Sequence, residues 1–230
     1  MNLFLPRHFS LAQFKRVTPI QPDTLWELVY TRNAHNIKVK RASAAVGNLQ
    51  KIIEATFYIA NQMGFSAMSL RDLTQATGLS MGGLYGYLQS KDDLAAMIED
   101  LIRHIAREIP GWFEQAPTPM ERIDSSLRAH IFMSELLQPW FYFVFMESRV
   151  LEAEQRQVAK AAELDFQSAI AAQIVQIGDL DQRQAFLLAA HLQSLTQDWY
   201  VKRWKYKAEK ITADEFANSL SALLAARLGQ

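Results

Sequence analysis

Three serines in the N-terminal half of the sequence, Ser69, Ser80 and Ser90, give the first indication of chemistry. Ser69 and Ser90 are each followed three residues later by an aspartate. This is the spacing of a capping box, in which a hydroxyl and a carboxylate satisfy free backbone N–H groups at a helix start. Ser80 is followed at the same distance by Gly83. A helix that begins at Ser80 would therefore have an N-terminus without a carboxylate, and such an N-terminus suits a phosphate group.

The helices that must position these serines follow from the apolar pattern and from glycine and proline. Ile53, Phe57, Ala60 and Met63 lie on one stripe of an amphipathic helix that begins near residue 48 and stops at Gly64. The spacing then predicts helices over 69–78, 80–88 and 90–110. Two short helices joined by a tight turn at 78–81 have the dimensions of a DNA-reading helix-turn-helix.

The third helix is unusual because it contains Gly82, Gly83 and Gly86. Each glycine costs about 1 kcal/mol in a helix interior relative to alanine, so Leu84 and Leu88 must hold this helix against its neighbours. Its bare face can approach another surface closely, such as DNA. Tight crossing of helices within the protein is the alternative explanation. A phosphate loop is disfavoured, since no strand precedes the glycines and no Lys-Ser or Lys-Thr pair follows them.

Residues 51–94, which read KIIEATFYIANQMGFSAMSLRDLTQATGLSMGGLYGYLQSKDDL, resemble the N-terminal domain of the TetR family of regulators. The resemblance implies a three-helix DNA-binding domain and a larger helical domain that dimerises and binds a small molecule. It also implies release from double-stranded operator DNA when that molecule binds. The matching residues are Ala55, Gly64-Phe65, Ser69 to Leu73, Gly78-Leu79-Ser80, Leu84-Tyr85, Ser90-Lys91 and Leu94.

By position, this resemblance also implies roles for single residues. It assigns phosphate contacts to Ser69, Arg71, Tyr85, Tyr87 and Lys91. Ser80, Met81, Gly82, Gly83 and Gly86 complete the expected DNA surface, the last four facing the bases. Few of these could make bidentate base contacts, so specificity is expected to depend on Arg71, on a basic arm or on DNA shape. The sequence departs from the family at Ala60, Thr74, Met81 and Leu88, where Phe, Ala, Lys and Phe are usual.

Charge is unevenly distributed, although 24 basic residues balance 24 acidic ones. Residues 1–46 carry a net charge of +5, against −1 for 47–95 and −4 for 96–230. Lys38, Lys40 and Arg41 cluster just before the first amphipathic helix and could reach an adjacent minor groove as a basic arm. A solvated tail is the alternative. The extension 1–46 has no sustained period and is predicted to be largely irregular, except for a short helix from Asp23 to Tyr30.

Beyond residue 94 the pattern is helical throughout. The predicted fold is all-α with about nine helices. An N-terminal three-helix DNA-binding domain (47–94) with the helix-turn-helix is followed by a larger helical domain for effector binding and dimerisation (95–230). The resemblance assigns residues 182–228 to a homodimer interface. No apolar run reaches the length of a membrane span and cysteine is absent, so we expect a cytoplasmic protein without disulfides or a membrane anchor.

Candidate effector residues lie in this larger domain. Residues 140–145 hold five aromatic side chains in six positions, which indicates a helix buried on every side, either as plain core or as the wall of an apolar ligand pocket. His130 and His191 lie in apolar contexts, where a histidine is either satisfied within the protein or bonds a ligand. The candidates for a small, largely apolar effector are His130, Trp140, Phe143, Met146, His191 and Trp199. No spacing indicates a metal or another cofactor.

Two other classes of protein are possible from the sequence. An enzyme is disfavoured, because the sequence has no nucleophile elbow, no phosphate loop with its lysine and no dinucleotide fingerprint, although serine and carboxylate side chains could still converge in space. A helical protein-interaction module without DNA binding is the main alternative, because residues 47–95 are almost neutral and the third helix is rich in glycine. The sequence favours a DNA-binding transcriptional repressor.

Overall fold

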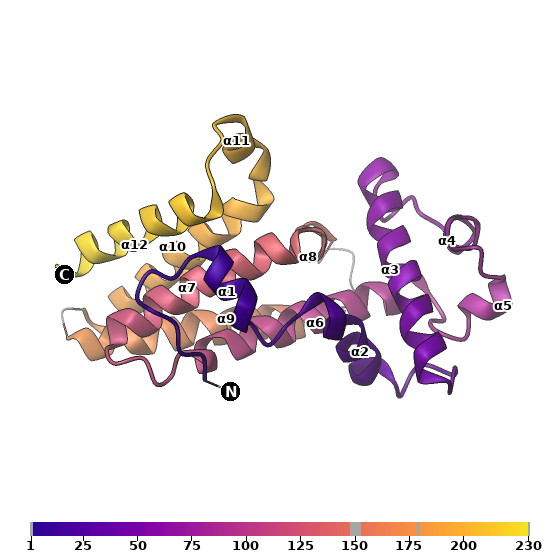
Figure 1. Cartoon of the computed structure of the whole chain (residues 1–230), viewed down its shortest axis with the longest axis horizontal. Coiled ribbons are helices and arrows are strands. Elements are labelled where there is room, and N and C mark those ends of the chain that lie inside the picture. The colour runs from indigo at the N-terminus through magenta and orange to yellow at the C-terminus, as the bar shows by residue number, and fades with distance from the viewer. Residues whose placement is uncertain (1, 148–152, 179, 230) are drawn as a thin grey trace. The chain divides into compact units, whose positions relative to one another are not determined.

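Helices are the only regular secondary structure in the computed structural model, which describes residues 2–147, 153–178 and 180–229 (Figure 1). The predicted all-α fold is therefore confirmed for this part of the chain. Its twelve helices are α1 (Leu11–Val17), α2 (Pro22–Asn33), α3 (Ala42–Met63), α4 (Leu70–Thr77), α5 (Met81–Leu84), α6 (Lys91–Trp112), α7 (Pro119–Leu136), α8 (Gln138–Glu147), α9 (Ala153–Ile177), α10 (Gln182–Val201), α11 (Arg203–Ala208) and α12 (Ala213–Leu228).

Helix starts that were predicted from capping boxes are confirmed. The Ser69 hydroxyl accepts from the Asp72 N–H at 3.3 Å, and the Asp72 carboxylate accepts from the Ser69 N–H at 2.8 Å. Ser90 and Asp93 bond in the same way at 3.2 and 3.1 Å before α6. The spacing alone was sufficient here, because each box is a local structure of four residues.

The N-terminal extension contradicts the prediction of largely irregular structure. Ser10 and Gln13 form a capping box that opens α1, and Pro22 occupies the first turn of α2. α1 is only two turns long and buries a single residue, Phe14, so it leaves no apolar stripe for a periodicity analysis to detect. A short amphipathic helix is invisible to that analysis even when it is firmly packed.

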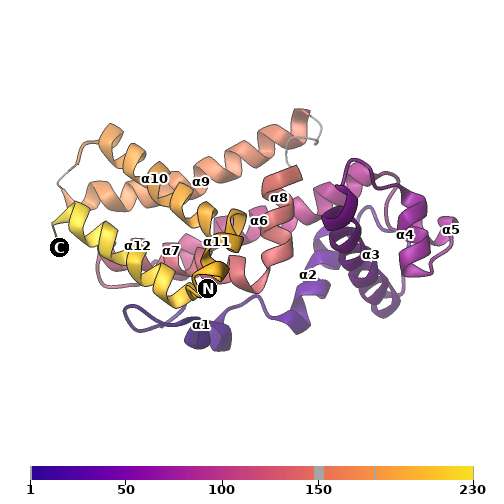
Figure 2. The same ribbon diagram turned by 90° about the horizontal axis from the view of Figure 1, so that it is seen from above.

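The chain divides into two compact units. Unit 1 comprises Met1–Thr18, Arg103–Tyr142 and Lys160–Gln230. Its centre is α7, in which every residue from Ile123 to Ser134 is buried, and α1, α10 and α12 pack against it. In Figure 1, α10 and α12 form the upper layer of this unit, which Figure 2 shows from above.

Unit 2 comprises Pro19–Ile102 and Phe143–Ala159. α3 packs against α2 on one side and α4 on the other, and α5 follows α4. Leu49, Leu73 and Leu84 are fully buried at the centre of these helices. Phe143 packs edge-on against Phe65 with 5.1 Å between ring centroids, so the end of α8 completes this core.

The length and polarity of the helices also bear on membrane insertion. Of the helices described, none is both long and apolar enough to cross a bilayer.

Candidate DNA-binding surface and effector site

The helix-turn-helix of unit 2 consists of α4, a turn over residues 78–80 and α5. At the start of α4, hydrogen bonds from the side chain and backbone of Ser69 lower the pKa of Asp72, which keeps this capping carboxylate ionised. At its end Gly78 adopts φ 72°, a left-handed conformation that glycine tolerates without strain. The Ser80 hydroxyl then accepts from the Gly83 N–H at 3.0 Å. Local hydrogen bonds therefore fix the motif at the start of α4 and at the start of α5.

α5 is shorter than predicted. It ends at Leu84, whereas the sequence predicted a helix through Leu88. Glycine has low helix propensity, and the Gly86 N–H turns back to the Gly83 carbonyl at 3.1 Å, which closes the segment after a single helical turn. Leu84 and Leu88 are both buried, as expected for the side chains that hold this segment in place.

Two glycines of this segment have different surroundings. A Cβ atom on Gly82 would have no other atom within 4 Å, so the backbone faces open space at this position. A Cβ atom on Gly86 would lie 3.1 Å from the Gly83 carbonyl oxygen and 3.1 Å from Cγ2 of Val39. Gly86 thus permits a close approach within the protein, whereas Gly82 leaves the outer surface bare.

The side chains expected to contact phosphates fall into two groups, those that are exposed and those that bond within unit 2. Ser69, which caps α4, and Arg71 in its first turn are exposed, and Tyr85 is 41% exposed. Tyr87 is buried and its hydroxyl accepts from Asn48 Nδ2 at 2.9 Å. Lys91 donates to the carbonyl oxygens of residues 65 and 66 at 3.1 and 2.8 Å. Tyr87 and Lys91 therefore hold unit 2 together, while the other three side chains form part of its surface.

The basic arm lies directly beside the α5 segment. The backbone N–H of Lys38 donates to the Gly86 carbonyl at 2.8 Å. The side chains of Lys38, Lys40 and Arg41 are all exposed. Upstream of the arm, Arg32 makes two hydrogen bonds to Asp100 of α6, at 2.6 and 2.9 Å. The arm and the α5 segment (residues 81–88, called the reading segment below) thus share one surface of unit 2. The sequence could not reveal that these two parts of the chain lie side by side.

In unit 1, His130 is the predicted effector residue with the most unusual environment. It lies on α7, is 5% exposed, and neither ring nitrogen has a hydrogen-bond partner among the described residues. Burial lowers its pKa to about 4, so the imidazole is neutral at pH 7. Its ring is surrounded by Phe141, Phe166 and Tyr200, with centroid distances of 5.5, 5.1 and 6.3 Å. A buried donor and acceptor without partners cost about 1–3 kcal/mol each, so this site favours a ligand that supplies them.

The other predicted effector residues have varied surroundings. Trp140 is buried, and Phe143 belongs to the core of unit 2. Met146 is 37% exposed, and His191 is exposed on α10. Trp199 is fully buried and packs between Tyr206 and Phe216, at 5.1 and 4.9 Å. Phe141 belongs to the aromatic run 140–145 that the sequence offered as a possible pocket wall. Phe166 and Tyr200 could not be found from the sequence, because only the tertiary packing of α9 and α10 brings them to His130.

The first residues of the chain form a strap (residues 2–18) on unit 1. Phe9 is buried and its ring packs on those of Phe14, Phe113 and Phe132, with centroid distances of 5.9, 5.7 and 5.8 Å. The Leu3 N–H donates to the carbonyl oxygen of residue 112 at 2.7 Å. The strap is therefore part of the hydrophobic core of unit 1.

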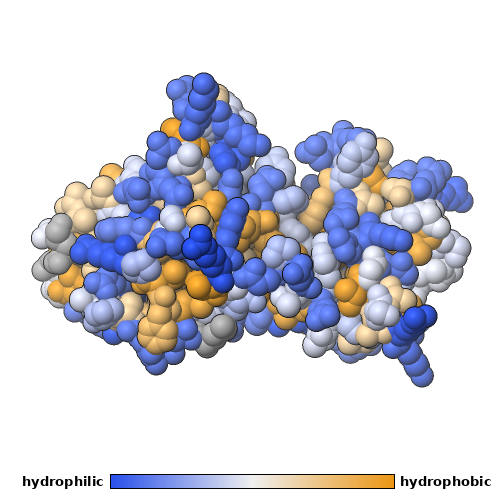
Figure 3. Space-filling model, viewed as in Figure 1, coloured by the Kyte–Doolittle hydropathy of each residue, from blue (hydrophilic) through white to orange (hydrophobic). Residues whose placement is uncertain are grey.

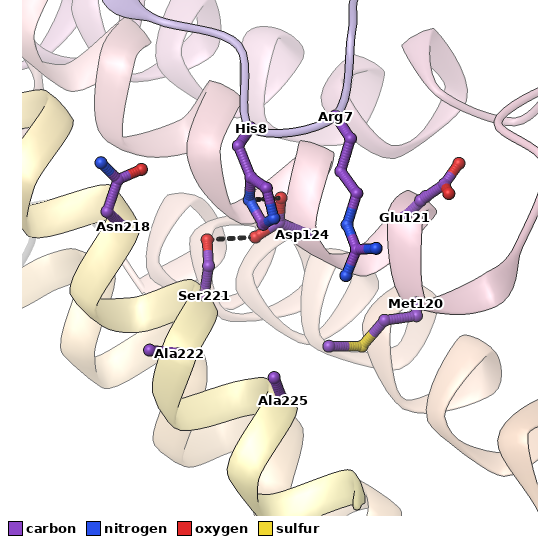
Figure 4. A pocket seen from close by; sticks show the side chains of 9 residues that line it. All are labelled: Arg7, His8, Met120, Glu121, Asp124, Asn218, Ser221, Ala222 and Ala225. Carbon is purple, nitrogen blue, oxygen red and sulfur yellow. Dashed lines mark hydrogen bonds and ion pairs between the residues drawn. The ribbon is translucent and has the colours of Figure 1, made fainter. Parts of the chain in front are cut away.

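Beside the strap lies a pocket of about 430 Å³ (Figure 4). Arg128, on α7, is buried and donates to Asn218 and Ser221 of α12, at 2.9 and 2.8 Å, and to the Phe9 carbonyl at 3.3 Å. Burial lowers the pKa of Arg128, and the nearby carboxylate of Asp124 opposes this shift. This network fastens the strap to α7 and α12. The pocket is lined by Arg7, His8, Met120, Glu121, Asp124, Asn218, Ser221, Ala222 and Ala225.

Three side chains of this pocket are types found in hydrolases, but their order differs from that of a catalytic triad. In a triad the histidine lies between the serine and the carboxylate and accepts the serine proton. Here Asp124 is the central group: Ser221 donates to it, and His8 Nδ1 lies 3.4 Å from its other oxygen (Figure 4). The arrangement therefore differs from a Ser-His-Asp triad, and its contacts join His8 of the strap to α7 and α12.

Comparison with known proteins connects these features to a family. Residues 52–98 match the model of bacterial regulatory proteins, tetR family. The TetR family transcriptional regulator PfmR from Thermus thermophilus has a similar structure, with a TM-score of 0.67 and 22% identity over 76% of this chain and 96% of that chain. A bacterial regulatory protein in the tetR family from Rhodococcus RHA1 matches with a TM-score of 0.70 and 17% identity, covering 79% of this chain and 96% of that one.

A third solved structure is described as the fatty acid degradation regulator FadR from Bacillus halodurans. It matches with a TM-score of 0.60 and 17% identity over 79% of this chain and 95% of that chain. No curated protein sequence matches. The family model thus covers the helix-turn-helix, and the solved structures share the all-helical fold.

Proposed function

We propose that this chain, a TetR family transcriptional regulator by its helix-turn-helix domain and its fold, is a repressor that leaves its operator when a small, largely apolar effector binds. The observation that carries the DNA-binding part is the shared surface of unit 2. There the exposed basic arm is hydrogen-bonded to the end of the α5 segment. A DNA-binding regulator of bacteria works in the cytoplasm, which is where we place this protein.

On the proposed surface, phosphates are bound by the exposed side chains of Ser69, Arg71 and Tyr85. The bare backbone at Gly82 allows the reading segment to approach the bases closely. Because α5 offers few side chains for direct base contacts, sequence preference falls to Arg71, to the arm in an adjacent minor groove and to DNA shape. Lys38, Lys40 and Arg41 supply the cations for that groove.

The proposed effector site is centred on His130. Its two ring nitrogens can serve one hydrogen-bond acceptor and one donor of a ligand, and the aromatic side chains around it suit an apolar body. A neutral ligand fits best, because the low pKa keeps this histidine uncharged. A hydroxyl or carbonyl on an otherwise apolar molecule has the required chemistry.

The proposed oligomer is a homodimer through residues 182–228. α10 and α12 carry exposed apolar side chains, including Leu187 (49% exposed) and Leu223 (55% exposed). Burying these side chains against a second copy is favourable by the hydrophobic effect. A two-fold dimer would present its reading segments to successive major grooves about 34–36 Å apart, which requires a near-palindromic operator.

The experiment that tests DNA binding compares the full chain with two triple variants on DNA that flanks its own gene. One variant carries Lys38→Ala, Lys40→Ala and Arg41→Ala. The matched control removes equal charge from exposed positions of unit 1 outside residues 182–228, with Lys15→Ala, Arg16→Ala and Lys160→Ala. Fluorescence anisotropy at two or more salt concentrations gives the affinity and its salt dependence.

We expect the arm variant to bind about 10- to 100-fold more weakly at low salt. The slope of log affinity against log salt should also fall by about 1 for each phosphate that the arm no longer neutralises, while the control keeps both values. Equal affinity and slope for the arm variant would make the arm a solvated tail. If the unmodified chain itself failed to bind at low salt, the protein-interaction module would be the better description.

A further inference from the structure

Four residues, Thr18 to Gln21, link the strap on unit 1 to α2 of unit 2. The boundary between the two compact units falls after Thr18, the last residue of the strap. Four residues can span at most about 14 Å, and the ring of Pro19 fixes its own φ, so this link (residues 18–21) is short and stiff. A movement of the strap therefore acts directly on the start of α2.

The strap runs along one face of α7. Asp124, Arg128 and Phe132 are spaced four residues apart, which places them on the same face of this helix. A carboxylate oxygen of Asp124 lies 3.4 Å from His8 Nδ1. Arg128 donates to the Phe9 carbonyl at 3.3 Å, and the Phe132 ring packs on the Phe9 ring with 5.8 Å between centroids. A shift of α7 must therefore carry the strap with it.

The end of the strap, where the link begins, is also anchored to α7. Thr18 is 3% exposed, and its hydroxyl donates to Met133 Sδ at 3.5 Å. One turn earlier Phe14 is fully buried, and its ring lies 6.0 Å from that of Phe132. The outer face of α1 carries hydrophilic side chains, so its apolar side faces into unit 1 (Figure 3). The link therefore starts at a point that is fixed to α7.

His130, the centre of the proposed effector site, lies on the opposite face of α7. It is two residues from both Arg128 and Phe132, which corresponds to about 200° around the helix. The rings of Phe141 and Phe166 lie 5.5 and 5.1 Å from the imidazole. A ligand that bonds His130 has to enter between α7 and these rings, and a close-packed core transmits such a displacement. α7 is thus the element that the proposed effector and the strap share.

On the side of unit 2, α2 leads from the link to the basic arm. Leu25 and Val29 of α2 are buried, and this helix packs against α3. The arm follows five residues after the end of α2, where the Lys38 N–H donates to the Gly86 carbonyl at 2.8 Å. Rigid helices carry coupling between distant sites. A shift at the start of α2 is therefore passed on to the arm and the reading segment.

We propose that the link transmits effector binding to the DNA-binding surface: the effector displaces α7, the strap moves with it, and the link shifts α2 and the arm. The inference rests on the proposed operator binding and effector site and goes beyond them, because it assigns the route between the two. Coupling between two sites is reciprocal, so DNA bound to unit 2 should in turn hold the strap more firmly on unit 1. The coupling can therefore be measured with DNA alone.

The first test inserts a flexible linker of alternating glycine and serine residues, about six in all, between Thr18 and Pro19 of the full chain. The insertion adds slack but leaves the contacts of the strap and of α2 in place. It also leaves α6 unchanged, which passes from unit 2 to unit 1 after Ile102. The matched control carries the same insertion between Pro117 and Thr118, two exposed residues in a turn that lies wholly within unit 1.

Hydrogen exchange followed by mass spectrometry, with and without DNA that flanks the gene of this protein, measures how firmly the strap is held. In the unmodified chain and in the control, DNA should slow exchange in the strap about 5-fold or more, which is the usual size of coupling between two sites. In the linker variant, DNA should bind but leave exchange in the strap unchanged. A strap that served only the stability of unit 1 would not respond to DNA in any of the three chains.

A second test combines the linker with Phe9→Ala, which loosens the strap. In the unmodified chain this substitution should weaken DNA binding, measured by fluorescence anisotropy, about 5-fold or more. In the linker variant its effect should be less than about 2-fold, because the slack link no longer passes the change to α2. A loss of stability in unit 1 alone would weaken binding equally in both chains. Phe4→Ala, at a position that is 82% exposed, is the matched control and should weaken binding in neither.

The outcomes separate this inference from the proposed function. If DNA slowed exchange in the strap as strongly in the linker variant as in the unmodified chain, the coupling would run through α6 and the link would be overturned. Exchange that ignores DNA in the unmodified chain, or an equal effect of Phe9→Ala with and without the linker, would also overturn the link and leave DNA binding intact. A chain that binds no DNA at low salt would overturn the proposed function, and the role of the link with it. Exchange that responds to DNA only without the linker supports the link.

Discussion

The helix-turn-helix of unit 2 and the surroundings of His130 in unit 1 differ in how their polar groups are satisfied. In unit 2 the polar groups of the helix-turn-helix bond to the backbone: Ser69 and Asp72 cap α4, and Ser80 caps α5. In unit 1, His130 is buried with both ring nitrogens unpartnered among the described residues. A surface that must meet a rigid duplex gains from being fixed in advance, whereas a core group without a partner leaves bonding capacity for a ligand.

The largest predicted effect is in unit 1, where aromatic side chains of the strap form part of the core. Phe9→Ala should lower the free energy of unfolding by about 3–5 kcal/mol, since the buried ring leaves a cavity among three other aromatic rings. The matched control is Phe4→Ala, because Phe4 is 82% exposed and its removal should change stability very little. Urea unfolding followed by circular dichroism measures both. Equal stability of the two variants would show that the strap is not part of the core.

His130 gives the second test, through the dependence of stability on pH. Its pKa is about 4 in the folded chain and 6.5 in the unfolded one, so between these values the unfolded chain binds more protons. The free energy of unfolding should therefore fall as pH drops from 6.5 to 4, by roughly 3 kcal/mol from this residue alone. His130→Leu should remove this contribution, and chemical unfolding at several pH values measures the difference between the two chains.

At pH 7 the same substitution should leave stability unchanged or raise it, because a leucine has no unpaired polar atoms to bury. The control is His191→Leu on α10, which makes the same exchange at an exposed position and should change the free energy of unfolding at pH 7 very little. If the stability difference between His130→Leu and the unmodified chain did not vary with pH, His130 would already have a partner. The contrast between the two units would then disappear.

Features that depend on residues close together in the sequence could be predicted, whereas features that depend on contacts between distant residues could not. The capping boxes at Ser69 and Ser90 join residues three apart, so their helix starts were predictable. The contacts of the arm with Gly86 and of the strap with Phe132 join residues far apart in the chain, and no local pattern encodes them. His130 could be singled out by its apolar context, but whether its nitrogens have partners depends on three other helices.

The smallest expected effect comes from the reading segment, where two neighbouring glycines serve as each other's control. Gly86→Ala would place a Cβ atom 3.1 Å from a backbone oxygen and from Val39, so we expect the free energy of unfolding to fall by about 1–3 kcal/mol. Gly82→Ala meets no atom within 4 Å and should be neutral or up to about 1 kcal/mol stabilising, through its higher helix propensity. Thermal unfolding of unliganded protein compares them without DNA. If both substitutions had the same effect, the arm would not pack closely against this segment. The helix-turn-helix would then be less rigid before DNA binding than its hydrogen bonds indicate.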